Sequence, residues 1–385
     1  MPNDPLPSLR VGLIGQKFMG RAHSNAFGQA ARFSGAPLRP VLELACGRDG
    51  GELENFGRTF GWRRTTTDWR ELTADPAVDL VDVATPNFLH AEPAIAALEA
   101  GKHVVCEKPL AGTLKDAAAM RTAAAAASCR TFCWFNYRRC PAVATAFQLI
   151  REGRLGRIFH ARATYLQSWG GAETPSSWRF RREQAGSGAH GDLNAHLIDL
   201  VRFLLGEEIE RVHGAVERTF VTERVEDSTG AKVPSDVDDA LLFTASSTGG
   251  TLCSFEASRL AGPHQNANSV ELNGELGSLR FEFEDMNVLQ FFDATDGPRE
   301  GGWRRVMCTH AGGHPYAEHW WPDAHLIGYE HTFTNQVGDM LRSISGAEIP
   351  VPLADFEDAY RTQVVLEAAM ISAAQQTSVP IAEVG

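Results

Sequence analysis

The fold of this chain is decided near its start by Leu9-Arg10-Val11-Gly12-Leu13-Ile14, which runs directly into Gly15-Gln16-Lys17-Phe18-Met19-Gly20. An apolar run of strand length, followed by a glycine turn and a helical stretch to Ala31, predicts a strand–turn–helix unit. The N–H groups of such a turn and the helix N-terminus can bind a pyrophosphate. We therefore predict that a dinucleotide contacts Gly15, Lys17, Phe18, Met19 and Gly20. The alternative is a junction of the same shape that holds no ligand.

One position of this turn departs from the usual G-x-G-x-x-G spacing. Lys17 stands where the second glycine normally lets the cofactor approach the backbone closely. The detailed geometry of the turn is therefore open at this position. The Lys17 ammonium could compensate by meeting a phosphate.

The end of the second expected strand bears on the choice between NAD and NADP. It reads Leu44-Ala45-Cys46-Gly47-Arg48-Asp49. An acidic residue at this strand end binds the ribose of NAD, but Gly47 occupies that place here. Arg48 can bind a 2′-phosphate bidentately, which favours NADP. Asp49, slightly later, could still serve NAD, so we predict NAD(P) with a preference for NADP.

The rest of the chain divides near residue 130. Before it, strands expected at 38–46, 79–84 and 103–106 alternate with helices at 91–100 and 117–127. Strict alternation predicts a parallel sheet with helices on both faces. After it, helices near 141–151 and 193–205 are followed by strands at 240–244, 251–257, 269–273, 278–284 and 288–292. Turn signals between these strands predict an antiparallel sheet. We expect domains at 1–130 and 131–385.

Composition excludes several classes of protein. The 385 residues carry a net charge of −12, which argues against a dedicated nucleic-acid binder. No stretch approaches the ~20 apolar residues of a membrane span, and the first residues lack the pattern of a secretory signal. Seven cysteines form no C-x-x-C motif. These features predict a cytoplasmic protein with no membrane partner.

Three later segments, in this order, resemble the Gfo/Idh/MocA family of NAD(P)-dependent oxidoreductases. They are Ala84-Thr85-Pro86-Asn87-Phe88-Leu89-His90, Cys106-Glu107-Lys108-Pro109-Leu110-Ala111 and Gly186-Ser187-Gly188-Ala189-His190-Gly191-Asp192-Leu193-Asn194-Ala195-His196-Leu197-Ile198-Asp199. Asn136-Tyr137-Arg138 and Ser177-Trp178-Arg179 extend the resemblance over both halves of the chain.

The resemblance implies an α/β protein with two domains. An N-terminal Rossmann dinucleotide-binding domain would precede a C-terminal α/β domain with a large, mostly antiparallel open sheet. The open face of that sheet would join subunits into a homodimer or homotetramer. The implied substrates are the hydroxyls or ketones of cyclic sugars, inositols and related polyols. The segments look most like members that act on pyranose sugars, levoglucosan and other glucosides among them.

The resemblance also assigns residues to the site. The expected catalytic residues are Lys108, Asp192 and His196. The expected cofactor contacts, besides the glycine turn and Arg48, are Thr85, Asn87, His90, Glu107, Lys108, Trp178 and Arg179. The expected substrate contacts are Asn136, Tyr137, Gln167 and Trp169. No metal is expected, because the histidines between residues 310 and 331 lack the i, i+4 spacing of a zinc protease.

The residues themselves support hydride transfer. Asp192, His196 and Asp199 are spaced i, i+4 and i+7, which predicts one polar face on an otherwise apolar helix. A histidine suits a general base near neutral pH, and a lysine can polarise the developing alkoxide. We predict His196 as base with Lys108 on the reacting oxygen, and Asp192 orienting the substrate or these groups. The reverse assignment, with Lys108 as base, stays open.

Each of these residues also has a structural interpretation. Asp192 and His196 could belong to a hydrogen-bonded network or a solvated face, and Lys108 could be a surface lysine before a turn proline. His90 could simply begin the helix that follows it. At the level of function, the alternatives are an NAD-dependent glycosidase acting by transient oxidation and elimination, and a non-catalytic regulator that senses the cofactor.

Overall fold

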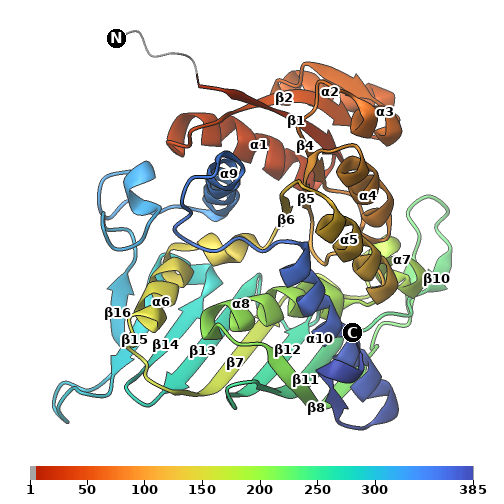
Figure 1. Ribbon diagram of the computed structural model, residues 1–385. Coiled ribbons are helices and arrows are strands. Elements are labelled where there is room, and N and C mark those ends of the chain that lie inside the picture. The colour runs from red at the N-terminus through yellow and green to blue at the C-terminus, as the bar shows by residue number, and fades with distance from the viewer. Residues whose placement is uncertain (1–5, 385) are drawn as a thin grey trace, which may run out of the picture. The chain divides into compact units, whose positions relative to one another are not determined.

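The computed structural model describes residues 6–384, which form two compact units. The first comprises residues 6–139, 318–321 and 327–360, and the second comprises 140–317, 322–326 and 361–384. The first unit thus extends beyond residue 130 to Arg139. It also includes α9 (Tyr329–Ser345), which lies beside α1 (Phe18–Phe33) although some 300 residues separate them in sequence (Figure 1). A late helix therefore contributes to the core of the early unit.

The first unit is built on a parallel sheet in the order β3-β2-β1-β4-β5-β6. Its strands are β1 (Ser8–Ile14), β2 (Arg39–Cys46), β3 (Arg64–Thr66), β4 (Leu80–Val83), β5 (His103–Cys106) and β6 (Thr131–Cys133). Its other helices are α2 (Gly50–Phe60), α3 (Trp69–Ala74), α4 (Ala91–Glu99) and α5 (Leu114–Ala126). The strand order reverses between β1 and β4, and this is where doubly wound sheets bind their ligands.

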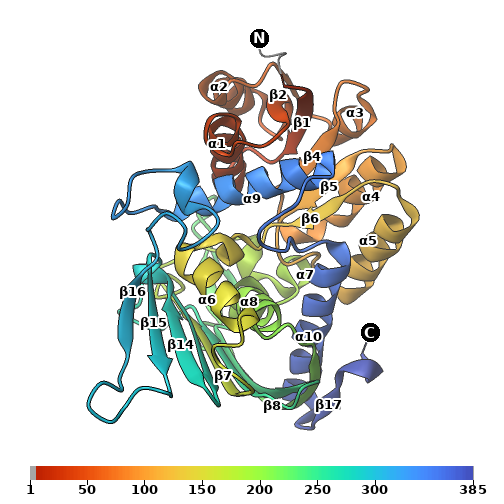
Figure 2. The ribbon, with the colours of Figure 1, turned by 60° about the vertical axis from the view of Figure 1, so that its left-hand side comes forward.

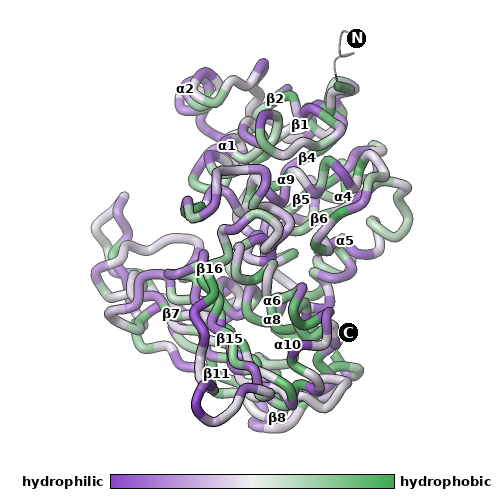
Figure 3. Tube along the Cα trace, turned by 90° about the vertical axis from the view of Figure 1, so that its left-hand side faces the viewer, coloured by the Kyte–Doolittle hydropathy of each residue, from purple (hydrophilic) through white to green (hydrophobic). Residues whose placement is uncertain are grey.

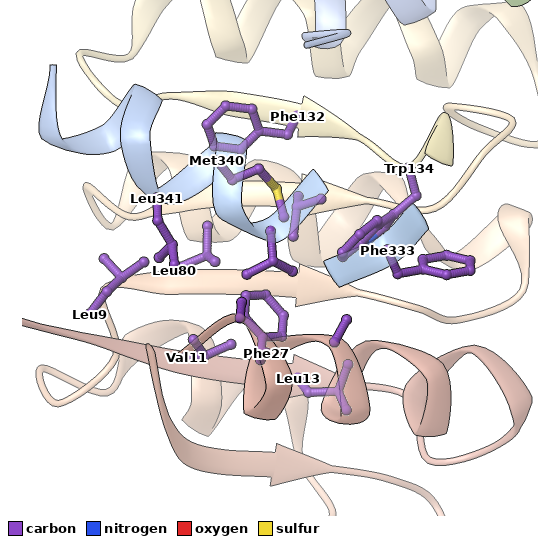
Figure 4. Close-up of a cluster of buried hydrophobic side chains, with 14 of the residues drawn as sticks. Leu9, Val11, Leu13, Phe27, Leu80, Phe132, Trp134, Phe333, Met340 and Leu341 are labelled. Atoms are coloured by element: carbon purple, nitrogen blue, oxygen red, sulfur yellow. The ribbon is translucent and has the colours of Figure 1, made fainter. Parts of the chain in front are cut away.

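The core of the first unit lies between the sheet, α1 and α9. Figure 4 shows Phe27 of α1 and Met340 and Leu341 of α9 beside strand residues such as Val11 and Leu80. All five are at most 1% exposed. Right-handed crossovers place α1 and α2 on one face of the sheet and α4 and α5 on the other. The α9 helix therefore covers the α1 face, which sequence alternation alone does not reveal.

The second unit is built on a nine-stranded sheet in the order β16-β15-β14-β13-β7-β12-β11-β8-β17. Only β7 and β12 pair in parallel, and every other neighbouring pair is antiparallel. The strands are β7 (Ile158–Leu166), β8 (Ile209–Arg218), β11 (Ala240–Ser247), β12 (Leu252–Ser258), β13 (Ala267–Gly274), β14 (Gly277–Glu282), β15 (Val288–Asp293), β16 (Arg304–Met307) and β17 (Val379–Pro380). The expected α/β class with a large, mostly antiparallel second sheet is confirmed.

Helices cover only one face of this sheet. α6 (Pro141–Arg151) and α8 (Ala195–Leu205) pack on it (Figure 2). The rings of Phe147 and Phe203 stack with their centres 4.6 Å apart. Figure 3 shows α8 as largely hydrophobic, as a helix buried against a sheet must be. The opposite face carries Val216, Leu242 and Leu252, which are 53%, 44% and 56% exposed.

The sequence pattern does not predict β7, although this strand lies near the middle of the second sheet. Its inward positions are largely alanine, such as Ala161 and Ala163, and its outward positions include His160 and Arg162. Small inward residues give a weak apolar alternation, so the strand is stabilised by its neighbours more than by its own pattern. A separate hairpin of β9 (Glu223–Val225) and β10 (Lys232–Pro234) and the short α7 (Arg182–Ala185) complete the unit. The long α10 (Phe356–Gln375) contributes to both units.

Candidate active site

The predicted phosphate-binding turn lies between β1 and α1. Gly15 has φ +128°, and a Cβ there would lie 2.5 Å from the carbonyl oxygen of Ala84, just after β4. A Cβ on Gly20 would lie 1.9 Å from the carbonyl oxygen of Gly15. Both positions therefore require glycine, and the turn passes closely over the end of β4. This geometry fits a dinucleotide pyrophosphate.

Lys17 fits the irregular position of this turn. Its φ is −88°, which any L residue can adopt, and it directly precedes α1. No side chain caps α1, so its first N–H groups are not bonded by a capping residue. The Lys17 ammonium forms an exposed ion pair with Glu52 of α2. The Lys17 charge is thus already paired with the Glu52 carboxylate, a contact that the sequence pattern does not predict.

The turn after β2 carries a second acidic residue, Asp49. Asp49 caps α2, because its Oδ1 accepts the N–H of Glu52 at 2.9 Å. Gln16 donates to Glu52 Oε2 at 3.3 Å, and a Cβ on Gly47 would collide with the Gln16 side chain. Arg48 is exposed. The polar groups beside this turn therefore include Glu52 as well as the predicted Arg48.

Glu107 and Lys108 follow β5, at the same carboxyl edge of the sheet. Glu107 is buried and its Oε2 accepts the backbone N–H of Lys108 at 3.1 Å. The Lys108–Pro109 peptide bond is cis. The carboxyl ends of β1, β4 and β5 thus carry Gly15, Thr85 and Glu107, and the predicted cofactor contacts of this unit gather at one edge.

His90 immediately precedes α4 and joins two of these turns. Its Nε2 lies 2.9 Å from the Thr85 carbonyl, and its Nδ1 lies 3.2 Å from the carbonyls of Pro109 and Leu110. The side chain is 1% exposed, and burial lowers the pKa of His90 despite these acceptors. His90 thus has a backbone carbonyl of the turn after β4 at one ring nitrogen and carbonyls of the turn that carries Lys108 at the other, while Asn87 is buried beside it.

The second unit holds Asp192 and His196 at the start of α8. Residues His190–Asn194 form a π-helical turn, so the regular α-helical spacing expected from Asp192 to Asp199 is interrupted. Asp238 stabilises this turn by accepting the N–H groups of Gly188 and His190 at 2.6 and 2.7 Å. His196 is 6% exposed, and the described α8 begins two residues later than the expected helix at 193.

Arg259 is the principal residue that sequence analysis missed. It follows β12, is 2% exposed, and its Nη2 donates to Asp192 Oδ2 at 2.8 Å. Its guanidinium also lies 5.0 Å from the centre of the Trp169 ring. An arginine at a strand end carries no motif of its own, so only the fold shows that it binds Asp192.

The predicted substrate contacts of this unit form one hydrogen-bonded group after β7. Trp169 Nε1 donates to Gln167 Oε1 at 2.5 Å, and Gln167 Nε2 donates to Asn266 Oδ1 at 2.6 Å. Tyr165 donates to the same oxygen at 2.7 Å, and its ring lies 5.9 Å from that of His196. Gln167 and Trp169 are therefore brought together with Asp192 and His196, with Tyr165, Asn266 and Arg259 as additional members.

The remaining predicted contacts come from both units. Trp178 and Arg179 are half-buried in the second unit, with the Arg179 guanidinium 4.5 Å from the Trp178 ring. Arg259 Nη1 donates to the Arg179 carbonyl at 3.4 Å. Asn136 and Tyr137 are buried in the first unit, where Asn136 donates to Thr332 of α9 at 2.8 Å.

Among residues 6–384, no group of three or more His, Cys, Asp or Glu side chains is arranged to hold a metal ion. Within the same residues, no helix is long and apolar enough to span a membrane.

Each unit offers a distinct part of the predicted chemistry. The first presents a tight glycine turn and a lysine at one sheet edge, and the second presents a histidine, a carboxylate and exposed aromatic surface.

Comparison with known proteins agrees with this division. Residues 9–135 match the model of the oxidoreductase family with an NAD-binding Rossmann fold, and residues 143–280 match the GFO/IDH/MocA C-terminal domain. Levoglucosan dehydrogenase of Pseudarthrobacter phenanthrenivorans is 39% identical over 98% of this chain and 100% of its own length.

Solved structures give the same result. An oxidoreductase domain protein from Kribbella flavida has a TM-score of 0.93 and 46% identity, covering 97% of this chain and 99% of its own. A levoglucosan dehydrogenase in complex with NADH and L-sorbose has a TM-score of 0.92 and 40% identity over the same shares. The chain belongs to the Gfo/Idh/MocA family of NAD(P)-dependent oxidoreductases.

Proposed function

We propose that this protein oxidises a secondary hydroxyl of a pyranose sugar, levoglucosan or a close relative, with NAD⁺ as the hydride acceptor. The observation that carries the proposal is the joined set of Asp192, Arg259 and Trp169 beside His196 in the second unit. Full-length similarity to levoglucosan dehydrogenase, whose structures include complexes with NADH and with levoglucosan, supports the same substrate class.

The second unit has the mixed surface that a sugar requires. A pyranose presents an apolar C–H face and a rim of hydroxyls, so its site needs an aromatic surface next to fixed polar groups. Trp169 is 37% exposed, and its indole N–H is tied to Gln167. Asp192 is held by Arg259 and retains partial exposure. These groups offer stacking and hydroxyl recognition within one unit.

Proton removal is assigned to the residues predicted from sequence. His196 lies at the start of α8, and an imidazole can take the hydroxyl proton near neutral pH. Lys108 would hydrogen-bond the reacting oxygen, and Asp192 would orient the substrate. Hydride acceptance is the chemistry that the nicotinamide ring supplies when the dinucleotide is bound. The pH–rate profiles of His196→Ala and Lys108→Ala decide which of the two residues is the general base.

The groups beside the glycine turn favour NAD over NADP. The sequence favoured NADP because of Arg48. In the structure, Glu52 pairs with Lys17 and accepts from Gln16, so a carboxylate already lies beside the turn that follows β2. A 2′-phosphate placed there would be repelled by Glu52 and would find Lys17 neutralised. The likeness to proteins solved with NADH agrees with this choice.

The proposal also includes an oligomeric state and a cellular compartment. Val216 pairs with Leu242 across β8 and β11, and these exposed residues lie on the uncovered face of the nine-stranded sheet. A second copy of the chain would bury this apolar face, giving a homodimer or homotetramer. All seven cysteines are free thiols, which fits a reducing cytoplasm.

The test is a panel of sugars and inositols incubated with NAD⁺ and NADP⁺ separately, followed by the absorbance of the reduced cofactor. We expect levoglucosan or a related pyranose to be oxidised with NAD⁺. Glycoside cleavage without net NADH would instead indicate a glycosidase. Cofactor binding without turnover of any sugar would indicate a regulator.

A further inference from the structure

A histidine of α1 lies buried between two carboxylates in the first unit. His23 is 0% exposed, and its Nδ1 lies 2.9 Å from Oδ2 of Asp82 in β4. Its Nε2 lies 3.1 Å from Oε1 of Glu107, just after β5. Asp82 is 0% and Glu107 5% exposed, so all three groups are withdrawn from water.

The two carboxylates against the ring favour the charged form of His23. A neutral imidazole has one N–H and one lone pair, so it can donate to only one of them. Burial by itself would lower the pKa of His23, but Asp82 and Glu107 outweigh it and raise the pKa to about 9. Two uncharged rings also lie against it: Trp134 stacks on it at 4.0 Å and Phe333 of α9 lies at 5.6 Å.

Both carboxylates are fixed at their second oxygens as well. Asp82 Oδ1 accepts the indole N–H of Trp134 at 3.0 Å. Glu107 Oε2 accepts the backbone N–H of Lys108 at 3.1 Å. A continuous chain of contacts therefore runs from Trp134 through Asp82, His23 and Glu107 to the backbone of Lys108.

We infer that His23 is a positioning residue for Lys108: as an imidazolium between Asp82 and Glu107, it fixes the carboxylate that binds the Lys108 amide. The inference deepens the proposed function, because it rests on the role given there to Lys108. His23 does not contact the reacting atoms in this account. It sets the conformation of the backbone from which the lysine extends.

No uncharged side chain of similar size can replace the imidazolium. In His23→Gln the amide NH2 can donate hydrogen bonds, but it places no positive charge between the carboxylates. Two buried carboxylates without a cation between them repel each other. We expect Glu107 to turn away, which leaves the Lys108 amide without its acceptor.

His90 holds the same turn by different means. Its Nδ1 lies 3.2 Å from the carbonyls of Pro109 and Leu110, on the far side of Lys108 in sequence. Loss of His23 therefore removes the support that Glu107 gives to the Lys108 amide, and it leaves the contacts of His90 in place. The expected result is local loosening at Lys108 and not unfolding of the whole turn.

The first experiment measures hydrogen exchange of the Lys108 amide in the cofactor-free protein. We expect exchange about tenfold or more faster in His23→Gln than in the unmodified protein. The matched control is His103→Gln, a histidine at the opposite end of β5 whose ring binds the Arg130 amide. That variant should leave Lys108 exchange unchanged. Unchanged Lys108 exchange in folded His23→Gln would overturn the inference.

The second experiment separates positioning from general stability. In His23→Gln we expect kcat to fall about tenfold or more, while KM for the cofactor changes by no more than about threefold. In the unmodified protein kcat should decline above about pH 9, as His23 loses its proton, and this decline should be absent in the variant. An equal fall in His103→Gln, or an unaltered alkaline decline in His23→Gln, would contradict the inference.

A third variant keeps the test decisive if His23→Gln does not fold. In Glu107→Gln the amide oxygen can still accept the Lys108 N–H, so Lys108 exchange should stay slow. One carboxylate is lost, so the alkaline decline of kcat should move to lower pH, and an unmoved decline would overturn the inference. Because the exchange experiment needs no substrate, failure to oxidise any sugar would reject the proposed function and leave the His23 result to stand or fall separately.

Discussion

Arg259 Nη2 donates a 2.8 Å hydrogen bond to Asp192 Oδ2, which joins the end of β12 to the π-helical turn before α8. The same guanidinium lies over Trp169. One buried cation thus sets the positions of a carboxylate and of an aromatic face that we assign to the sugar. The pairing gives Asp192 a fixed orientation, which a solvated carboxylate on a helix would lack.

Replacement of Arg259 should therefore impair sugar binding and turnover together. We expect Arg259→Gln to lower kcat/KM for the sugar about a hundredfold, because the carboxylate and the indole lose their shared support. The Kd for NADH should change little. Arg280→Gln, which removes an exposed pair with Glu282 on β14, is the control and should keep full activity.

Lys108 and His196 are expected to dominate the chemical step. Lys108→Ala and His196→Ala should each lower kcat by about 10² to 10⁴. The variant that has lost the general base should also lose the acidic limb of the pH–rate profile, which identifies the base. Near-normal kcat in both variants would reject the assigned mechanism.

Glu52 should control the choice of cofactor. We expect Glu52→Gln to raise the ratio of kcat/KM for NADP⁺ to that for NAD⁺ about fivefold to tenfold, because a repulsive charge is removed and Lys17 is released. Glu54→Gln, an exposed glutamate of the same helix, serves as control. An equal ratio in the two variants would show that Glu52 does not face the ribose.

Stability should depend on pH through His23. The pKa of His23 is about 9 in the folded protein, against 6.5 for an ordinary histidine. Its stabilisation is therefore complete below about pH 6.5 and is lost as pH rises through about 9. The loss is about 3 kcal/mol of unfolding free energy, at 1.36 kcal/mol per pKa unit.

The comparison with His23→Gln isolates this contribution. Burial raises the pKa of Cys46 and of Cys253 to about 12, so ionisation of the unfolded thiols also destabilises the protein in alkali. Those contributions are common to both proteins. Between about pH 7 and about pH 9.5, denaturant unfolding should show a larger loss of unfolding free energy in the unmodified protein than in His23→Gln. An equal loss in the two proteins would mean that His23 is not an imidazolium.

The uncovered sheet face should be the subunit interface. Leu252→Asp places a charge on this face, and we expect it to lower the mass measured by light scattering to that of the monomer. Phe220→Asp, on an exposed loop outside the sheet, is the control. An unchanged mass in Leu252→Asp would place the interface elsewhere.

The sequence was sufficient where local pattern determines structure. The glycine turn, the alternation of strands and helices and the Glu107-Lys108-Pro109 turn were all predicted, because each depends on neighbouring residues. Contacts between distant segments were not. β7 has alanines inward, α9 joins the first unit from far along the chain, and Arg259 meets Asp192 only through the second sheet.

The sequence carries one sign of the environment of His23. Asp82 lies in β4, whose other residues are apolar and buried. A carboxylate buried in such a strand needs a cation or hydrogen-bond donors beside it. The strand pattern therefore indicates that Asp82 has a buried partner. It could not have identified His23, because the helix pattern places many residues on the buried face of α1.

Hydride transfer from a sugar carbon is tested with levoglucosan that carries deuterium on its ring carbons. If the protein transfers a hydride from a sugar carbon to the nicotinamide, the reduced cofactor must acquire deuterium from the sugar, and turnover must be no faster than with the unlabelled compound. We expect mass spectrometry to find deuterium in the NADH formed. Sugar consumption that yields NADH without deuterium, or product without any NADH, would contradict the account.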